Sequence, residues 1–430
     1  MNTHKLSNAI SGILRDIFSP ENQMTEANQE TAYLFQRIAN GWKLTASEKV
    51  RLDEAVEILR RKYNKVHART CRKYLEGFCC EQFPGNYACF QAKLPELFNE
   101  LDQANQNKSD VFVEIAGLQL QMERFRLGSI EFLHSDDPMI DELRKSVPDI
   151  NGNYADPLPG KCVVARCCVE GDSEYSREVA VERIQLALDI LQFASAPLNS
   201  SLLKQSILGF GLYLGENQTP ASLKTWTYQQ NKPSWHSYSG QAKRPNNHLG
   251  KFGLQLNKEN LEKMQQCKLP ELGEILSRFG RSHFEENILS AIRWFAKAVR
   301  DVELEDKYLN LFIALEGLLS NDVSNSENSP KAAFTHREGV AFLLGQDTES
   351  RMHFHEKFGE LAKTRNKIVH SGYSLIDETE LLDLFNYVLL CCFKALELKD
   401  NFKEAGSFSK WAKRVKFGEP IDVILESNEN

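Results

Sequence analysis

Arg365, Asn366 and His370 are the residues of this chain whose types and spacing suggest chemistry. They fall in one short segment, 365–370, that is otherwise apolar at helical spacing. The guanidinium of arginine is the side chain best suited to gripping a phosphate. Histidine is the one side chain that exchanges protons near neutral pH without help. Together the two types are enough, in principle, to cleave a phosphodiester without a metal ion.

The spacing alone is not specific, because Arg278 and His283 repeat it elsewhere in the chain. Five positions on an ideal helix amount to about 140° of rotation, so Arg365 and His370 do not share a face. Asn366 and His370, four positions apart, do share one. A site that uses all three needs a bent helix end, a long reach by the arginine, or a second copy of the chain. The alternative is a solvated helix edge, with His370 favoured by the helix dipole.

Five amphipathic patterns near the C-terminus are expected to position this segment. The segment closes the fourth of them, and Ser371-Gly372 has the composition of a helix stop signal. Short connections between such helices predict a compact helical bundle. The apolar stripes of the five expected helices lie at 288–299, 304–319, 332–344, 354–368 and 381–396.

The remainder of the chain divides into a helical N-terminal region and a mixed region. A helix start is predicted at 45–48, and apolar stripes at helical spacing lie on both sides of it, one of them at 32–38. A less regular stretch covers 71–90. Residues 111–115 and 118–125 alternate as half-buried strands do. We predict an α+β multidomain protein that is mainly α. Its domains are a helical region at 1–105, an α+β domain at 106–257, and a helical bundle with a tail at 258–430.

Further elements are expected within the middle domain. Strands are predicted at 162–169 and 207–214, and a helix at 179–193. Residues 217–253 are rich in Pro, Asn, Gly, Ser and aromatics, which indicates loop or short strand. Their aromatic and basic residues could bind a ligand or a trigger, although aromatics in such a domain are more often core. These residues are Trp226, Tyr228, Trp235, His236, Tyr238 and Lys243.

Composition narrows the class of protein. The net charge of −7 argues against sequence-independent coating of DNA but permits a small local site for RNA. No apolar run is long enough for a membrane span, so we expect no membrane partner and a cytoplasmic location. Six of the ten cysteines form vicinal pairs, which favours reduced thiols in a core over a disulfide framework. The pairs are Cys79-Cys80, Cys167-Cys168 and Cys391-Cys392.

The region from about 285 to 398 resembles the HEPN superfamily, and within it the ApeA-like HEPN domains. Ile292-Arg293-Trp294-Phe295 opens the first bundle helix, and residues 311–319 resemble the typical "alE-LL" helix. Residues 361–372 then supply the Arg-polar-x-x-x-His hallmark and the usual "vHsG" ending. The resemblance rests on these parts occurring in this order, and it covers about a third of the chain.

The resemblance implies a metal-independent endoribonuclease without a cofactor. Such domains work as dimers whose Arg-His motifs face a shared cleft, and many are toxins or abortive-infection effectors in prokaryotic anti-phage defence. It further implies that His370 is the general base or acid and that Arg365 stabilises charge on the phosphate. Asn366 would orient the phosphate or the imidazole. Glu316 would support the site from the facing helix, or be an ordinary surface carboxylate. The N-terminal two thirds would respond to a regulatory or phage-derived trigger.

Other interpretations stay open. The bundle could be a non-catalytic HEPN module that binds RNA, nucleotide or a partner protein. Candidate RNA contacts are Lys367 in the motif and, in the tail, Lys410, Lys413 and Arg414, which are interleaved with Phe408 and Trp411. An amphipathic helix packed on the bundle explains the tail equally well.

A metal site has little support in the sequence. His353 and His355 lie two apart on a predicted helix, so they should face different directions and lie on the surface. A set of one histidine and four cysteines near the N-terminus lacks the Cys-x-x-Cys spacing of zinc sites. That set is His67, Cys71, Cys79, Cys80 and Cys89.

Overall fold

The computed structural model places most of the chain in helices, with one antiparallel sheet and a short parallel pair of strands. The structure describes residues 3–17, 46–82, 88–146, 163–198, 211–212, 222–229, 232–239, 254–301, 303–319, 336–372, 375–404 and 406–418. In this part of the chain no helix is both long enough and apolar enough to cross a membrane.

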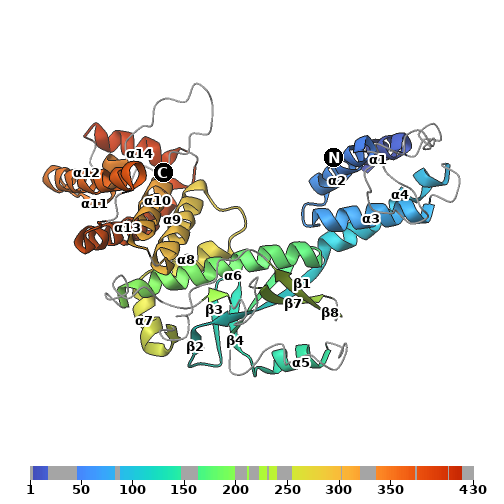
Figure 1. Cartoon of the computed structure of the whole chain (residues 1–430), viewed down its shortest axis with the longest axis horizontal. Coiled ribbons are helices and arrows are strands. Elements are labelled where there is room, and N and C mark those ends of the chain that lie inside the picture. Colours follow the sequence, from blue (N-terminus) through green and yellow to red (C-terminus); the bar gives the residue numbers. More distant parts are fainter. Residues whose placement is uncertain are drawn as a thin grey trace.

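Four N-terminal helices form a core of their own, apart from the other elements (Figure 1). They are α1 (Thr3–Ile17), α2 (Ala46–Lys62), α3 (Ala68–Gln82) and α4 (Ala88–Gln106). Helix was predicted here, and the described residues confirm it. The stretch at 71–90 was predicted to be less regular than its neighbours, and its residues 71–82 lie in the regular helix α3. Cys71, Leu75, Phe78 and Cys79 are all buried and recur at helical spacing, with cysteine acting as a small apolar residue. The expected stripe at 32–38 lies outside the described residues.

The sheet is built around β1 (Lys108–Ala116), which pairs with β5 (Val163–Glu170) on one side and with β7 (Ser222–Gln229) on the other. Val111 stands opposite Cys167 in one pairing and opposite Thr227 in the other. The strand order is β3-β4-β5-β1-β7-β8, and all these pairings are antiparallel. The remaining strands are β3 (Arg124–Leu127), β4 (Ile130–His134), β8 (Lys232–Ser239) and β6 (Gly211–Leu212), which also pairs with β1.

Three details of the sheet differ from the sequence predictions. Residues 111–115 were expected to be half-buried, but all five are buried because β1 is central and covered on both faces. Residues 118–125 do not form one strand. They divide between β2 (Leu118–Leu120), which pairs in parallel with β9 (Leu254–Leu256), and the start of β3. The segment predicted as loop or short strand contains the eight-residue strands β7 and β8, joined as a hairpin.

Helix α6 (Ser173–Ser195) joins the sheet to the C-terminal helices (Figure 1). It begins six residues before the predicted start because Asp172 caps it, accepting the N–H groups of Glu174 and Tyr175. One side of α6 packs on the sheet and the other on α9 (His283–Arg300). Buried residues of both regions therefore belong to one continuous core.

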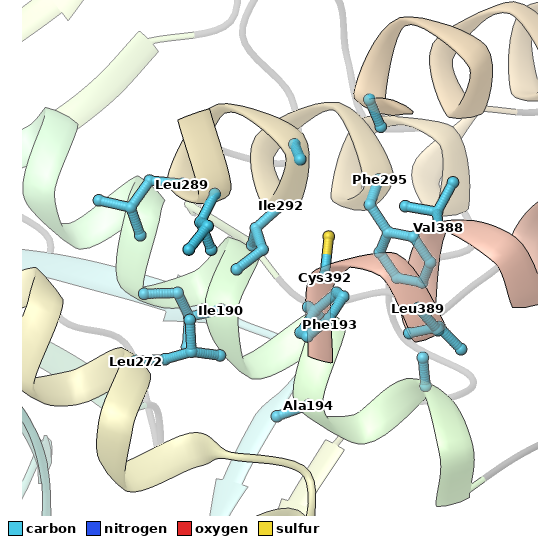
Figure 2. Packing of buried hydrophobic residues seen from close by; sticks show 14 of the residues in the cluster. Ile190, Phe193, Ala194, Leu272, Leu289, Ile292, Phe295, Val388, Leu389 and Cys392 are labelled. Atoms are coloured by element: carbon cyan, nitrogen blue, oxygen red, sulfur yellow. The ribbon is translucent and has the colours of Figure 1, made fainter. Parts of the chain in front are cut away.

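The contact between α6 and the C-terminal helices is aromatic and aliphatic (Figure 2). Phe193 of α6 meets Phe295 of α9 edge to face, with ring centroids 5.2 Å apart. An ion pair joins the same two helices, in which Arg300 Nη1 lies 2.7 Å from the buried carboxylate of Asp189. Burial is the main cause that raises the pKa of Asp189, and the guanidinium opposes it. The expected burial of free thiols is confirmed for Cys167, Cys391 and Cys392, whereas Cys168 is exposed.

The five predicted bundle helices are confirmed as α9 to α13, within the described residues. They are α9, α10 (Leu304–Leu318), α11 (His336–Leu344), α12 (Thr348–Ser371) and α13 (Glu378–Leu398). A capping box starts α9, in which Ser282 accepts the N–H of Glu285 and Glu285 accepts the N–H of Ser282. The smaller helices around them are α5 (Pro138–Ser146), α7 (Lys258–Gln266), α8 (Leu269–Ser277) and α14 (Ser407–Lys416).

Candidate functional site

Helix α12 carries the Arg-Asn-His motif in its last two turns. It starts at a capping box in which Asp347 and Ser350 bond each other's backbone N–H. It ends at Gly372, which adopts φ 59° and donates its N–H to the carbonyl of Ile368 at 3.1 Å. Only glycine takes up this left-handed conformation readily. The predicted stop signal is therefore confirmed, and it leaves His370 exposed in the final turn.

Arg365 is fixed by neighbours from two helices. Its Nη2 lies 3.5 Å from Glu316 Oε1 on α10, and its Nη1 donates to Asn366 Oδ1 at 3.3 Å. Its guanidinium also lies 5.9 Å from the centre of the Phe312 ring. About a third of each ion-pair side chain stays exposed, 32% for Arg365 and 30% for Glu316. The arginine is oriented in this way but still open to a ligand.

The groups around Arg365 line an open hollow of about 360 Å³ between α10, α11 and α12. This volume is in the range of small-molecule sites. Its floor is apolar, because Phe312 and Phe358 stack with centroids 5.0 Å apart. Its rim carries cationic, amide and imidazole groups and one carboxylate. The lining residues are Phe312, Glu316, His336, Arg337, His355, Phe358, Ala362, Arg365 and Asn366.

The structure brings Arg365, Asn366 and Glu316 together but does not bring His370 to them. His370 is not among the lining residues of the hollow. It lies one helical turn beyond Asn366 on the same face of α12. Among the described residues, no hydrogen bond or ion pair joins His370 to Arg365. The separation expected from helix geometry is therefore present within one chain.

The second copy of the spacing has a structural explanation. Arg278 follows the end of α8 and pairs with Glu285 at 2.5 Å, so it braces the capping box of α9. His283 is the first residue of α9. Arg278 therefore holds a helix-to-helix connection together, and neither Arg278 nor His283 lines the hollow.

Three polar residues of the hollow were not singled out as site residues from the sequence. His336 and Arg337 open α11, and His355 comes from α12. His355 was expected on the surface with His353; His353 is exposed, but His355 is half-buried and faces the hollow. Arg337 lies against Gly359, where a Cβ atom would approach its guanidinium to 3.0 Å. No motif spacing signals these residues, because they meet only through the packing of α11 on α12.

His336 is electrostatically linked to the rest of the hollow. Although the residue is exposed overall, packing around its ring lowers the pKa of His336. Desolvation is the main cause, Glu316 opposes it, and Arg365 adds to it. Both charges lie in the same hollow as the His336 ring. A lowered pKa keeps the imidazole neutral at pH 7, the state in which it accepts a proton.

Two charge-removing substitutions are expected to move the pKa of His336 in opposite directions. Glu316→Gln removes an anion that favours the imidazolium, so the pKa falls; Arg365→Gln removes a cation, so the pKa rises. Titration of the His336 ring followed by NMR measures both shifts. Glu360→Gln removes an exposed carboxylate that does not line the hollow and serves as the control. Shifts of the His336 pKa in the same direction in both variants would contradict the placement of Glu316 and Arg365 beside this ring.

The tail forms the amphipathic helix α14, packed on the bundle. Its aromatic residues, Phe408 and Trp411, are buried and stack on each other at 5.5 Å. The suggestion that they stack on RNA bases is therefore wrong. Lys410, Lys413 and Arg414 are exposed on the opposite face of α14, and Lys367 is exposed on α12. Lys416 ties α14 to α11 through Glu338 at 2.9 Å.

The remaining residues suggested as metal ligands or as ligand contacts do not come together in one site within the described residues. Within the described residues, no group of three or more His, Cys, Asp or Glu side chains is arranged to hold a metal ion. Cys71 and Cys79 are buried in the N-terminal core. The aromatic residues suggested for a ligand lie in β7 and β8, and Lys243 lies outside the described residues.

Comparisons with family models, with curated proteins and with solved structures find no match to this chain. The residues of the hollow and the motif that α12 carries are therefore the features that point to a function.

Proposed function

We propose that this chain is a metal-independent endoribonuclease of the HEPN type. The observation that carries the proposal is the orientation of Arg365. It is held by Glu316 and lies beside Asn366 at the rim of an open hollow, with His370 one turn further along α12. An arginine that is braced but one-third exposed suits a phosphodiester, because its fork can bind two phosphate oxygens.

The chemistry of this proposal is internal transesterification. A general base takes the proton of the ribose 2′-hydroxyl, and the 2′ oxygen attacks the phosphorus. The bond from phosphorus to the 5′ oxygen breaks, and a general acid gives that oxygen a proton. Arg365 stabilises the charge that develops on the phosphate, and His370 performs one of the two proton transfers. The products are a 2′,3′-cyclic phosphate and a 5′-hydroxyl.

A second copy of the chain completes the proposed enzyme. His370 lies apart from Arg365 in one chain, so a partner would bring another imidazole to the phosphate. Exposed apolar side chains near His370 in sequence support this: one lies in the last turn of α12, one in the connection between α12 and α13, and one in the first turns of α13. Val369 is 50% exposed, Leu375 77% and Leu382 39%. Such side chains suit a homodimer interface.

The cellular role that we propose is a cytoplasmic toxin or abortive-infection effector in anti-phage defence. The N-terminal helices and the sheet would sense a regulatory or phage-derived trigger. The N-terminal helices contact the start of α6 at Asp172. This carboxylate accepts hydrogen bonds from His67 N–H and from Thr70 Oγ1, the latter at 3.1 Å. Lys65 adds an ion pair to Glu170 at 2.6 Å. A signal received by the N-terminal helices would reach the bundle through α6.

The direct test is cleavage of RNA in the presence of a chelator. Purified full-length protein is expected to cut a long RNA with EDTA present, because arginine and histidine supply the charge and the proton transfers. Gel analysis of end-labelled RNA measures the cleavage, and mass spectrometry identifies the cyclic phosphate. Cleavage that stops with EDTA and returns with added magnesium would contradict the proposal.

A non-catalytic HEPN module is the second candidate. One observation favours it: Glu316 already satisfies Arg365, and His370 stands outside the hollow. In that case the hollow binds RNA, nucleotide or a partner protein without cutting. Cleavage by the parent and its loss in a His370→Ala variant would exclude this candidate, whereas tight RNA binding without cleavage would favour it.

A further inference from the structure

His336 and His355 are the two imidazoles that line the hollow with Arg365, whereas the motif histidine does not line it. His336 comes from α11, on a different element from Arg365 and Asn366. Glu316 of α10 and Arg365 of α12 line the same hollow, and their charges shift the pKa of His336 in opposite directions. Arg337 follows it on α11, and His355 lies in the same lining. A phosphate bound by Arg365 and Asn366 would enter the hollow that His336 borders.

We infer that His336 is the general base of the cleavage reaction, and that His370 is the acid. The inference rests on the proposed ribonuclease function and assigns its two proton transfers to two named side chains. His336 Nδ1 or Nε2 accepts the proton of the 2′-hydroxyl while the 2′ oxygen bonds to phosphorus. The 5′ oxygen leaves with a proton from His370. His336 has then gained one proton and His370 has lost one. Proton exchange with water returns both rings to their starting states.

The electrostatic setting of His336 suits the base. Four titratable or charged groups face it from the elements around it: Glu316, Arg337, His355 and Arg365. The net effect lowers the pKa of His336, so its ring is unprotonated at neutral pH. Glu316 opposes that lowering, and the same carboxylate favours the imidazolium once the proton arrives. A general base must be unprotonated at the start of the step and must be stabilised once it holds the proton.

The experiment measures RNA cleavage by full-length variants across a range of pH. His336→Ala is expected to slow cleavage by about 10²- to 10⁴-fold at neutral pH, the usual contribution of a general base. It should also lose the acidic limb of the pH–rate profile, and added imidazole should restore part of the rate. His336→Gln, which retains a polar side chain, guards against a folding defect. His353→Ala removes an exposed histidine of α12 outside the hollow and should cut as the parent does.

A substrate with sulfur as the 5′ bridging atom separates base from acid. Its leaving group needs no proton, so the substrate should restore cleavage by His370→Ala but not by His336→Ala. Restoration of His336→Ala instead would overturn the assignment. If His336→Ala cuts at the parent rate while His370→Ala does not cut, the inference fails and the proposed function stands. If both variants cut at the parent rate, the proposed site fails as well.

A binding measurement decides the question if the parent cuts no RNA in the assay. Adenosine 3′-monophosphate is titrated into protein labelled on the histidine rings, and NMR follows the His336 signals. They are expected to shift in the parent and to stay unchanged in Arg365→Ala, which lacks the phosphate contact. His336 signals that stay unchanged in the parent while those of His370 move would overturn the inference.

Discussion

Replacement of His370 by alanine is expected to slow RNA cleavage by about 10²- to 10⁴-fold, because it removes one of the two proton transfers. The protein should stay folded. His370 is exposed in the last turn of α12, and substitutions at such positions change stability by less than about 0.5 kcal/mol. Initial rates on end-labelled RNA, with EDTA present, measure the effect. Circular dichroism and size-exclusion chromatography check the fold and the assembly.

The matched control for this prediction is His353→Ala. His353 is also an exposed histidine of α12, but it lies outside the hollow and more than four turns from His370. Its loss should leave cleavage unchanged. Loss of cleavage in His370→Ala, purified in the same way as an active His353→Ala, would exclude a contaminating nuclease as the source of activity. A His370→Ala protein that cuts as fast as the parent would refute the assignment of this residue. Toxicity on overexpression should fall in parallel with the cleavage rate.

Replacement of Phe295 by alanine is expected to lower the free energy of unfolding by about 3 to 5 kcal/mol. Its side chain is fully buried where α6, α9 and α13 meet (Figure 2). The ring lies 5.2 Å from that of Phe193 and 4.8 Å from that of Phe385. Alanine leaves a cavity between three helices and removes both aromatic contacts. The core shared by the sheet and the bundle should weaken as one unit, because α6 belongs to both.

Phe279→Ala is the control for that change. Phe279 is 85% exposed, and its main contact is the guanidinium of Arg183 at 5.2 Å from the ring centre. Its loss should cost no more than about 1 kcal/mol, the scale of an exposed cation–π contact. Urea unfolding followed by circular dichroism compares the two variants and the parent. Equal losses for Phe295→Ala and Phe279→Ala would contradict the packing described for α6, α9 and α13.

Local sequence periodicity located most elements of this protein. The helices α9 to α13 follow from apolar residues at spacings of three and four, which a single helix presents on one face. The pattern is less regular at α3, where Cys71 and Cys79 occupy buried positions of the apolar stripe. Periodicity did not reveal that β7 and β8 form a hairpin, because the segment 217–253 that contains them has the Pro, Asn, Gly and Ser content of a loop. Pairing with β1, distant in sequence, makes these residues a sheet.

The sequence by itself determined that Arg365, Asn366 and His370 lie at the end of a helix that Gly372 terminates. It also determined that Arg365 and His370 point in different directions, since both statements depend on helix geometry within a few residues. Only the tertiary structure decided which groups surround Arg365. Glu316 and His336 are distant from it in sequence and belong to different helices, so no local spacing relates them. They meet because α10, α11 and α12 bury their apolar faces against one another and leave their polar edges around one hollow.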